Sequence, residues 1–365
     1  MSTEPVPAAT SEDVHVVPIG ALRATAVVLL RQVRVPPDHA EQIAEVLIDT
    51  ELRGYSDHGI LSLGRLVDRC RTGAVNPTPR PRIVREAPAA MLLDADQGCG
   101  IIASRQAMEW CIAAARKQGL ASAGVTNSSH FIGCAFYVEL AARAGMIGFA
   151  CGSAGQAMPP PGGLTAILAT NPLGYAYPAR RHDPVILDMA TTASAGAKIS
   201  LAAQLGHPIE PGLLTDADGN PTTDPGVLGA GGLMLPTGGY KGFGLAMVVD
   251  CLAGVLTGAG FALTGGITHG QSGHFFWALN IETYMPLHQF LTRVDEQLDQ
   301  IKRSRRAPGV SEILVPGERS QRRRRQLYRS GKVPLPTVSW NELGRLCADL
   351  DVPAPPRERP VARGE

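Results

Sequence analysis

The chain has 365 residues and a nearly balanced charge, with 34 Lys and Arg residues against 33 Asp and Glu residues, a formal net charge of +1. This balance argues against a nucleic-acid partner, because proteins that bind nucleic acids present a broad basic surface. A hydrophobic fraction of 44% excludes a disordered chain and predicts a sizeable buried core. At roughly 150 residues per domain, the length corresponds to about two domains, with one large α/β domain as the alternative.

The spacing of apolar residues predicts an α/β protein with helical ends. One helix is predicted to follow an N-cap at Ser56 or Asp57 and to end at Gly73. Helical spacing predicts the other helices over 19–33, 37–53, 101–118, 131–144, 192–205, 240–256, 286–303 and 339–350. Short apolar runs bounded by Gly, Pro or Asn predict strands over 89–96, 121–128, 146–152, 165–171 and 184–190. Residues 1–17 and 352–365 are predicted to be flexible tails.

The seven cysteines are scattered along the chain and form no Cys-x-x-Cys pair. Most lie in apolar or helical patterns, which predicts buried thiols and a reducing, cytoplasmic location. The first 15 residues lack a basic start followed by an apolar core, so no secretion signal is expected. No apolar run reaches the roughly 20 residues that cross a bilayer, so no membrane contact is expected.

The segment Thr126-Asn127-Ser128-Ser129-His130-Phe131 joins a predicted strand to a predicted helix. If Ser128 or Ser129 caps that helix, His130 lies in its first turn, where the helix dipole favours a neutral imidazole. A neutral imidazole accepts the proton of a hydroxyl that is being oxidised, and its protonated form returns one to a carbonyl. The alternative is a capped helix with a polar first residue.

Other motifs carry weaker signals. Taken alone, His58 beside Asp57 is better explained as a structural histidine. The segment 98–103, Gly-Cys-Gly-Ile-Ile-Ala, only partly matches the G-x-G-x-x-G dinucleotide fingerprint, and a tight turn is the simpler interpretation. No His or Cys residues have metal-ligand spacing, so no metal site is expected.

Two further segments are candidates for ligand binding. The segment 238–244, Gly-Gly-Tyr-Lys-Gly-Phe-Gly, combines backbone amides, a helix start and Lys241, which suits a phosphate or carboxylate. A glycine-rich turn with a solvated lysine explains it equally well. The arginines from Arg322 to Arg325 predict a solvated helix face, with RNA binding as the weak alternative.

Over residues 18–350, the chain resembles the type-2 malate/L-lactate dehydrogenase family, which includes sulfolactate and ureidoglycolate dehydrogenases, diketogulonate reductase and the reductase of cyclic 2-carboxy imines. The resemblance rests on nine motifs in order: ELRGYSDHG (51–59), SSHF (128–131), PPGG (160–163), ATNPLGYAYP (169–178), LDMATT (187–192), IEPGLLTDADGNPTTDP (209–225), LPTGGYKGFGLAMVVDCLAGVLTGAGF (235–261), GHFFWALN (273–280) and VPGE (315–318).

The resemblance implies a non-Rossmann NAD(P)-binding α/β fold, a mixed sheet core with helical N- and C-terminal parts. Residues 18–85 with 282–351 are expected to form a helical, dimerisation part. Residues 86–281 are expected to form the core that binds coenzyme and substrate. The resemblance also implies a homodimer, a small-molecule substrate and NADH or NADPH as coenzyme.

By the same resemblance, His130 is the acid–base histidine, and His58 is a second active-site histidine with Asp57 beside it. The residues that match coenzyme-contacting segments are Asn171, Asp188, Met189, Ala190, Thr191, Thr192, Lys241, Pro316, Gly317 and Glu318. For Lys241, this agrees with the anion-binding interpretation of its glycine-rich segment.

The chain departs from the family at the expected substrate site. Members read S-H-G-x-x-R, whereas Asp57 replaces the serine and Ser62 replaces the arginine that holds the substrate carboxylate. Arg65 restores that contact if its side chain reaches back by one turn, and Arg53 is a further candidate for substrate binding. An added carboxylate and a lost guanidinium disfavour an ordinary anionic 2-oxo acid.

The sequence therefore predicts an NAD(P)-dependent oxidoreductase that moves a hydride to or from a C=O or C=N carbon, with an amine- or imine-bearing substrate favoured by Asp57. One alternative is a standard malate- or lactate-type 2-hydroxy acid dehydrogenase. Another is a nicotinamide-binding descendant without catalytic activity.

Overall fold

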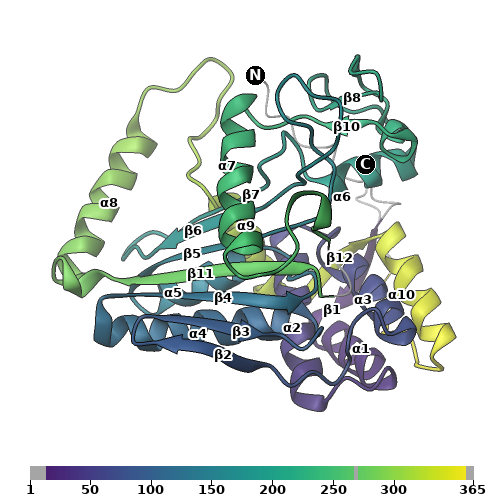
Figure 1. Ribbon diagram of the computed structural model, residues 1–365, viewed down its shortest axis with the longest axis horizontal. Coiled ribbons are helices and arrows are strands. Elements are labelled where there is room, and N and C mark those ends of the chain that lie inside the picture. The colour runs from purple at the N-terminus through teal and green to yellow at the C-terminus, as the bar shows by residue number, and fades with distance from the viewer. Residues whose placement is uncertain (1–13, 267–269, 359–365) are drawn as a thin grey trace. The chain divides into compact units, whose positions relative to one another are not determined.

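The computed structural model describes residues 14–266 and 270–358, which form two compact units (Figure 1). Among the described residues, the smaller unit joins 14–72 with 320–358, and the larger unit lies between Gly73 and Arg319. Residues 73–85 and 282–319, predicted to belong with the helical part, therefore cluster with the sheet. The outer parts of the two predicted tails, 1–13 and 359–365, lie outside the described residues.

The smaller unit is helical, with one short antiparallel sheet. Strand β1 (Val14–Pro18) pairs with β12 (Lys332–Pro336), and Val17 is fully buried opposite Val333. The prediction of a tail up to residue 17 is therefore wrong for residues 14–17, because this apolar segment pairs with a strand near the other end of the chain. The predicted tail from residue 352 is likewise wrong for 352–358, because Val352 is buried and the Glu358 N–H donates to the Val16 carbonyl at 2.9 Å. The helices are α1 (Ile19–Gln32), α2 (Pro37–Arg53), α3 (Ile60–Thr72), α9 (Glu318–Ser330), which begins at the edge of the larger unit, and α10 (Thr337–Asp349).

The larger unit is built on a mixed seven-stranded sheet with the order β2-β3-β4-β11-β5-β6-β7. Only β3 and β4 pair in parallel, and every other neighbouring pair in this sheet is antiparallel. The strands are β2 (Arg82–Ala87), β3 (Ala90–Asp94), β4 (Leu120–Ser128), β5 (Met146–Gly152), β6 (Leu173–Tyr177), β7 (Val185–Met189) and β11 (Ser272–Asn280). The mixed order confirms the expected non-Rossmann α/β architecture.

Both faces of this sheet are covered (Figure 1). Alternate residues of the central strand β11 point to opposite faces, so Phe276 packs with α4 (Gly100–Gln118) and α5 (Ala135–Arg143). Phe275 and Trp277 pack on the other face with Val249 of α7 (Tyr240–Asp250). This two-sided burial explains why the strands are apolar runs rather than alternating patterns.

The rest of the larger unit consists of short strands and helices. A small sheet has the order β10-β8-β9, with β8 at Leu214–Thr215, β9 at Pro221–Thr222 and β10 at Leu233–Met234. The remaining helices are α6 (Gly196–Leu205), α8 (Leu287–Arg303), a π-helical segment at Cys251–Val255 and 3-10 turns at Pro225–Ala230, Ala262–Thr264 and Ile281–Thr283.

Two predicted elements of the larger unit differ from the structure in their type or continuity. The expected strand over 165–171 is wrong, since its only strand-like pairing is an isolated bridge between Met158 and Leu168. The predicted helix over 240–256 is interrupted after Asp250, where it widens into π-helical geometry.

Candidate active site

His130 lies in an irregular segment between β4 and α5, half-buried. The prediction that it opens a helix is wrong, because α5 begins only at Ala135. Ile132 adopts φ +78°, a left-handed conformation that a β-branched residue rarely accepts, and this interrupts any helical path from Ser129. The N-terminus of α5 therefore begins five residues after His130. Its Ala135 N–H donates to the Asp188 carboxylate at 2.8 Å.

The backbone before His130 is packed against the turn that opens α4. The Ser129 hydroxyl donates to the carbonyl of Gly98 at 2.9 Å. A Cβ on Gly100 would lie 2.2 Å from the Ser129 carbonyl oxygen, so only glycine permits this approach. These glycines therefore seat the His130 segment, an interpretation that the G-x-G spacing alone did not suggest.

Phe131, the residue after His130, is also held in place by several contacts. The Phe131 ring stacks on His274, with ring centroids 4.3 Å apart, and on Tyr137 at 5.5 Å. The hydroxyl of Tyr137, which is fully buried, donates to the Phe131 carbonyl at 2.7 Å. Burial raises the pKa of Tyr137 well above its usual value, so it remains a neutral donor. The imidazole of His130 thus projects from a backbone that is anchored on both sides.

His274, in the central strand β11, is buried, with 1% of its surface exposed. Its Nε2 lies 3.1 Å from the Ser128 hydroxyl and 3.0 Å from the Ser129 carbonyl oxygen. Burial lowers the pKa of His274 to about 4, because a charged imidazole would lose its hydration there. His274 is therefore neutral near pH 7.

The buried His274 predicts acid-sensitive folding. Its pKa is lowered from 6.5 to about 4, so between these values the unfolded chain binds a proton that the native protein does not. Stability is therefore lost as the pH falls through this window, by up to about 3 kcal/mol. Urea unfolding at pH 7 and pH 4.5 measures the loss, and His274→Gln, which cannot titrate, should lose less. Equal losses in the two proteins would contradict the assignment.

In the smaller unit, the turn at residues 56–59 leads into α3. The predicted N-cap at Ser56 or Asp57 is wrong, because α3 begins at Ile60 and its first N–H donates to Glu51 Oε2 at 3.0 Å. Ser56 donates to Glu51 Oε1 at 2.5 Å. Glu51 comes from the end of α2 and is fully buried, and this burial raises its pKa. It ties the turn that carries His58 to α2.

Within this turn, the side chains of Asp57 and His58 are paired. Asp57 Oδ2 lies 3.1 Å from His58 Nδ1, and the two side chains are 12% and 28% exposed. A carboxylate at Nδ1 fixes the orientation of the ring and leaves Nε2 as the nitrogen for other partners. Part of the Asp57 charge is thus engaged within the turn itself.

Arg65 reaches back to the position from which the family arginine is missing. Its Nη2 lies 3.0 Å from the Ser62 hydroxyl and also donates to the backbone carbonyl of Asp57. The Ser62 hydroxyl donates to the same carbonyl at 3.1 Å. Burial lowers the pKa of Arg65, and the carboxylates of Asp57 and Glu342 oppose that shift. Arg65, one turn further along α3, therefore places its guanidinium beside Ser62.

Arg53 has a different environment from the predicted substrate contact. Its side chain is 2% exposed, and Nε donates to Asp49 at 2.6 Å. Arg324 donates to the other oxygen of Asp49 at 2.9 Å, and only 8% of Arg324 is exposed. The structure favours a structural role for Arg53. It also corrects the prediction that Arg322 to Arg325 form one solvated face, since Arg324 is buried.

In the larger unit, the segment from Asp188 to Thr192 leaves the end of β7. Thr191 is fully buried and its hydroxyl donates to the Thr170 carbonyl at 3.0 Å, while the Thr192 hydroxyl donates to the Ser194 carbonyl at 2.7 Å. Met189 packs among the apolar residues below α7, and Ala190 is half-buried. These contacts define the path of the backbone here.

Asn171, like Thr191, is a fully buried member of the predicted coenzyme residues. Its Nδ2 donates to the Ala246 carbonyl of α7 at 3.1 Å, and its Oδ1 accepts the Ala154 N–H at 3.3 Å. Its φ of +25° marks an unusual backbone position. The side chain thus joins α7 to the strand region, which favours an indirect role.

The glycine-rich segment before α7 is open and carries one cation. Gly238 and Gly239 have φ of +60° and +65°, and no heavy atom lies within 4 Å of a Cβ placed on Gly239. Lys241 is exposed in the first turn of the helix. A Cβ on Gly242 would lie 2.6 Å from the Thr191 carbonyl oxygen, so this helix start is packed against the end of the β7 segment. The arrangement fits a phosphate of a dinucleotide.

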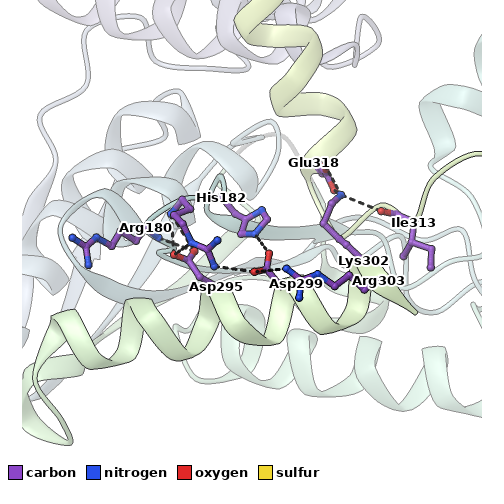
Figure 2. Close-up of polar contacts among 9 residues, drawn as sticks. Arg180, His182, Asp295, Asp299, Lys302, Arg303, Ile313 and Glu318 are labelled. Atoms are coloured by element: carbon purple, nitrogen blue, oxygen red, sulfur yellow. Dashed lines mark hydrogen bonds and ion pairs between the residues drawn. The ribbon is translucent and has the colours of Figure 1, made fainter. Parts of the chain in front are cut away.

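The Pro316–Glu318 turn also packs against β7. The Ile186 N–H donates to the Pro316 carbonyl at 3.2 Å, and Gly317, at φ +82°, approaches so closely that a Cβ would lie 2.7 Å from the Ile186 carbonyl oxygen. The Glu318 carboxylate binds Lys302 of α8, with both oxygens at 2.7 Å from Nζ (Figure 2). Its charge therefore secures this turn to α8.

Helix α8 is itself anchored by the loop before β7 (Figure 2). Asp295 accepts the backbone N–H groups of Arg180 and Arg181 at 3.1–3.2 Å, and Asp299 pairs with His182 at 2.9 Å. These hydrogen bonds lower the pKa of both carboxyls. The predicted amphipathic helix thus holds the Pro316–Glu318 turn in place through Lys302.

Among residues 14–266 and 270–358, no three His, Cys, Asp or Glu side chains gather closely enough to hold a metal ion. The helices in this part of the chain are also too short or too polar to span a bilayer.

Comparison with known proteins gives one consistent result. Residues 17–344 match the family model described as malate/L-lactate dehydrogenase. The chain is 35% identical over 330 residues to L-sulfolactate dehydrogenase from Methanocaldococcus jannaschii, covering 88% of this chain and 93% of the relative. It is 30% identical over 295 residues to ureidoglycolate dehydrogenase (NAD(+)) from Escherichia coli O157:H7, covering 79% and 84% of the two chains.

A solved structure extends the comparison to a reductase. The fold matches that of delta1-piperideine-2-carboxylate reductase from Pseudomonas syringae pvar. tomato with a TM-score of 0.81 and 25% identity, over 90% of this chain and 99% of the other. The fold and the matched relatives thus define a dehydrogenase or reductase. The chain belongs to the malate/L-lactate dehydrogenase family, as its motifs indicated.

Proposed function

We propose that this protein transfers a hydride between NADH or NADPH and the C=O or C=N carbon of a small polar substrate that carries a carboxylate, with His130 as the acid–base group. The observation that carries the proposal is the His130 segment. Ser129 and Phe131 are both fixed by hydrogen bonds, and Ile132 is held at φ +78°. Backbone strain of this kind persists where the surrounding structure fixes a functional group.

In this proposal, the bound reduced nicotinamide supplies the hydride. As the substrate carbon accepts it, the protonated His130 imidazole gives its proton to the oxygen or nitrogen, so that C=O becomes CH–OH or C=N becomes CH–NH. In the reverse direction, the neutral imidazole takes that proton. A positioned acid–base group contributes roughly 10²–10⁴-fold to the rate. His58, oriented by Asp57, is assigned to binding or orienting the substrate.

For the coenzyme, Lys241 and the open glycine-rich segment are assigned to an anionic phosphate. The supporting walls of the coenzyme site are assigned to residues whose side chains are largely bonded within the protein. These are Asp188 to Thr192, the Pro316–Glu318 turn and Asn171. The relative from E. coli has NAD(+) in its name. The proposed coenzyme is either NADH or NADPH.

The proposed substrate is a carboxylate that also bears an amine or imine nitrogen. Arg65 supplies a cation for the carboxylate, while Asp57 adds a negative charge that stabilises a nearby cationic nitrogen. This preference is supported by a solved relative of the same fold whose name, delta1-piperideine-2-carboxylate reductase, gives such a compound as its substrate. A C=N carbon is therefore preferred over C=O.

Replacing Asp57 tests this preference. Pyruvate, oxaloacetate and delta1-piperideine-2-carboxylate are assayed side by side with Asp57→Ser. The kcat/KM ratio of imine to oxo acid should fall about tenfold, since a charge interaction of about 1.4 kcal/mol is removed. The ratio corrects for any general loss through His58, and Asp68→Ser on α3 is the control. An unchanged ratio, or efficient malate turnover by the natural protein, would refute the imine preference.

A second candidate substrate is an ordinary 2-hydroxy acid of the malate or lactate type. The specific observation in its favour is the combination of Arg65 beside Ser62 and the pairing of Asp57 with His58, which leaves a cation for the carboxylate and partly neutralises the added negative charge. The same three-substrate assay separates the two candidates.

We also propose that the protein works as a homodimer in the cytoplasm. Large apolar side chains are exposed on α7 and the segment that follows it, among them Tyr240, Met247, Val248, Leu256 and Leu263. Exposed large apolar side chains gathered on one segment favour an interface there. Six of the seven cysteines are buried and only Cys251 is exposed, as befits a reducing compartment.

A further inference from the structure

Strand β4, which ends two residues before His130, is bulged near that end. Ser128 is paired with Ser272, but Val125 is paired with His274, so Thr126 and Asn127 together oppose the single residue Gly273. Asn127 adopts φ +51° at this bulge. Bulges next to active sites redirect the side chains that follow them. Here the bulge brings the Ser128–Ser129 backbone against the side chain of His274.

The contact between His274 and Ser129 fixes the proton on one ring nitrogen. The Ser129 carbonyl oxygen can only accept a hydrogen bond, so Nε2, at 3.0 Å from it, carries the hydrogen. Nδ1 is then a lone-pair acceptor. It is buried and has no hydrogen-bond partner among the described residues. An unpaired buried acceptor destabilises the fold, so an apolar ring would serve the core better than this histidine.

We infer that His274 is a positioning residue for His130: its Nε2–H fixes the Ser129 carbonyl, and with it the peptide group from which His130 begins. The ring face of His274 stacks on Phe131, so one side chain contacts both neighbours of His130. An unfavourable core residue of this type is expected where function requires it. The inference rests on the acid–base role proposed for His130.

The test compares variants that keep or remove the Nε2 donor. His274→Gln places an amide N–H near the Nε2 position, whereas His274→Phe keeps the stacked ring and removes the donor. We expect His274→Phe to lower kcat about 10- to 100-fold with the coenzyme KM within twofold, because small displacements of a reacting group are costly. His274→Gln should restore kcat to within about threefold of the natural protein.

The control is Phe149→Leu, a core truncation on the other face of the sheet, which should lower the melting temperature and leave kcat unchanged. A His274→Phe protein with the kcat of the natural protein would overturn the inference. If His274→Phe does not fold, His274→Asn, whose shorter amide cannot reach Ser129, replaces it. Equal kcat for the Asn and Gln variants would then overturn the inference.

A parallel His130→Gln protein distinguishes a failure of the proposed function from a failure of the positioning role of His274. If His130→Gln retains full turnover, or if the natural protein reduces none of pyruvate, oxaloacetate and delta1-piperideine-2-carboxylate with NADH or NADPH, the proposed function fails. If His130→Gln is inactive while His274→Phe is fully active, the proposed function stands and the positioning role fails.

Discussion

Replacing His130 by Gln is expected to lower kcat by about 10²–10⁴-fold while the dissociation constant of the coenzyme stays within twofold. Glutamine occupies a similar volume but cannot exchange a proton near neutral pH, so the loss falls on the chemical step. Single-turnover absorbance of the reduced coenzyme measures the chemical step, and coenzyme fluorescence measures binding.

His207→Gln is the matched control, because His207 is an exposed histidine of the same unit with no assigned role. It should retain full activity. If His130→Gln retains the kcat of the natural protein, the acid–base assignment is wrong. If the natural protein binds the coenzyme but consumes none with any candidate substrate, the chain is a descendant without catalytic activity.

Replacing Arg65 by Met should lower kcat/KM by about 10- to 150-fold, mainly through a higher KM for the substrate. A hydrogen bond to a charged group contributes about 1.5–3 kcal/mol, and methionine keeps the apolar stem while it removes the guanidinium. Arg65→Lys should recover only part of the loss, because an ammonium cannot form the two-pronged contact with a carboxylate. Steady-state kinetics with each substrate measure the effect.

Arg71→Met on the same helix is the control for Arg65, since Arg71 is exposed near the end of α3. An unchanged KM in Arg65→Met would show that the guanidinium beside Ser62 does not bind the substrate. In that case, Asp57 and Ser62 would define a site that recognises something other than a carboxylate.

Much of the secondary structure could be predicted from local patterns. Helices with a continuous apolar stripe, such as α2 and α4, begin and end within a residue or so of the predicted bounds. The position of β11 in the middle of the sheet could not be predicted, because it depends on pairing with β4 and β5, more than 120 residues earlier in the chain. The pairing of β1 with β12 was missed for the same reason.

For the site, the residue types were predictable and their surroundings were not. The sequence indicated His130 through its chemistry and the family motif, but the supporting argument from a helix N-terminus was wrong. Ile132 in a left-handed conformation separates the histidine from α5, and no local pattern signals this. The contacts of Ser129 with Gly98 and His274 join three distant segments, so they became visible only in the structure.

Among the proposed substrate-binding residues, too, some contacts were predictable from the sequence and others were not. The reach of Arg65 toward Ser62 could be predicted, because residues three apart on a helix lie on one face. The burial of Arg53 against Asp49 could not, since Asp49 also binds Arg324 from α9. Glu51 was overlooked as well, although a carboxylate three residues before Gly54 and nine before the start of α3 is a reasonable candidate for a cap of that helix.

The most direct measurement is a crystal structure of the protein with reduced coenzyme and oxalate, an unreactive carboxylate, bound together. We expect one imidazole nitrogen of His130 to lie within about 2.6–3.2 Å of the oxalate oxygen that takes the place of the reacting atom, beside the nicotinamide ring. An imidazole out of hydrogen-bond reach of that oxygen, with another titratable group in its place, would contradict the account.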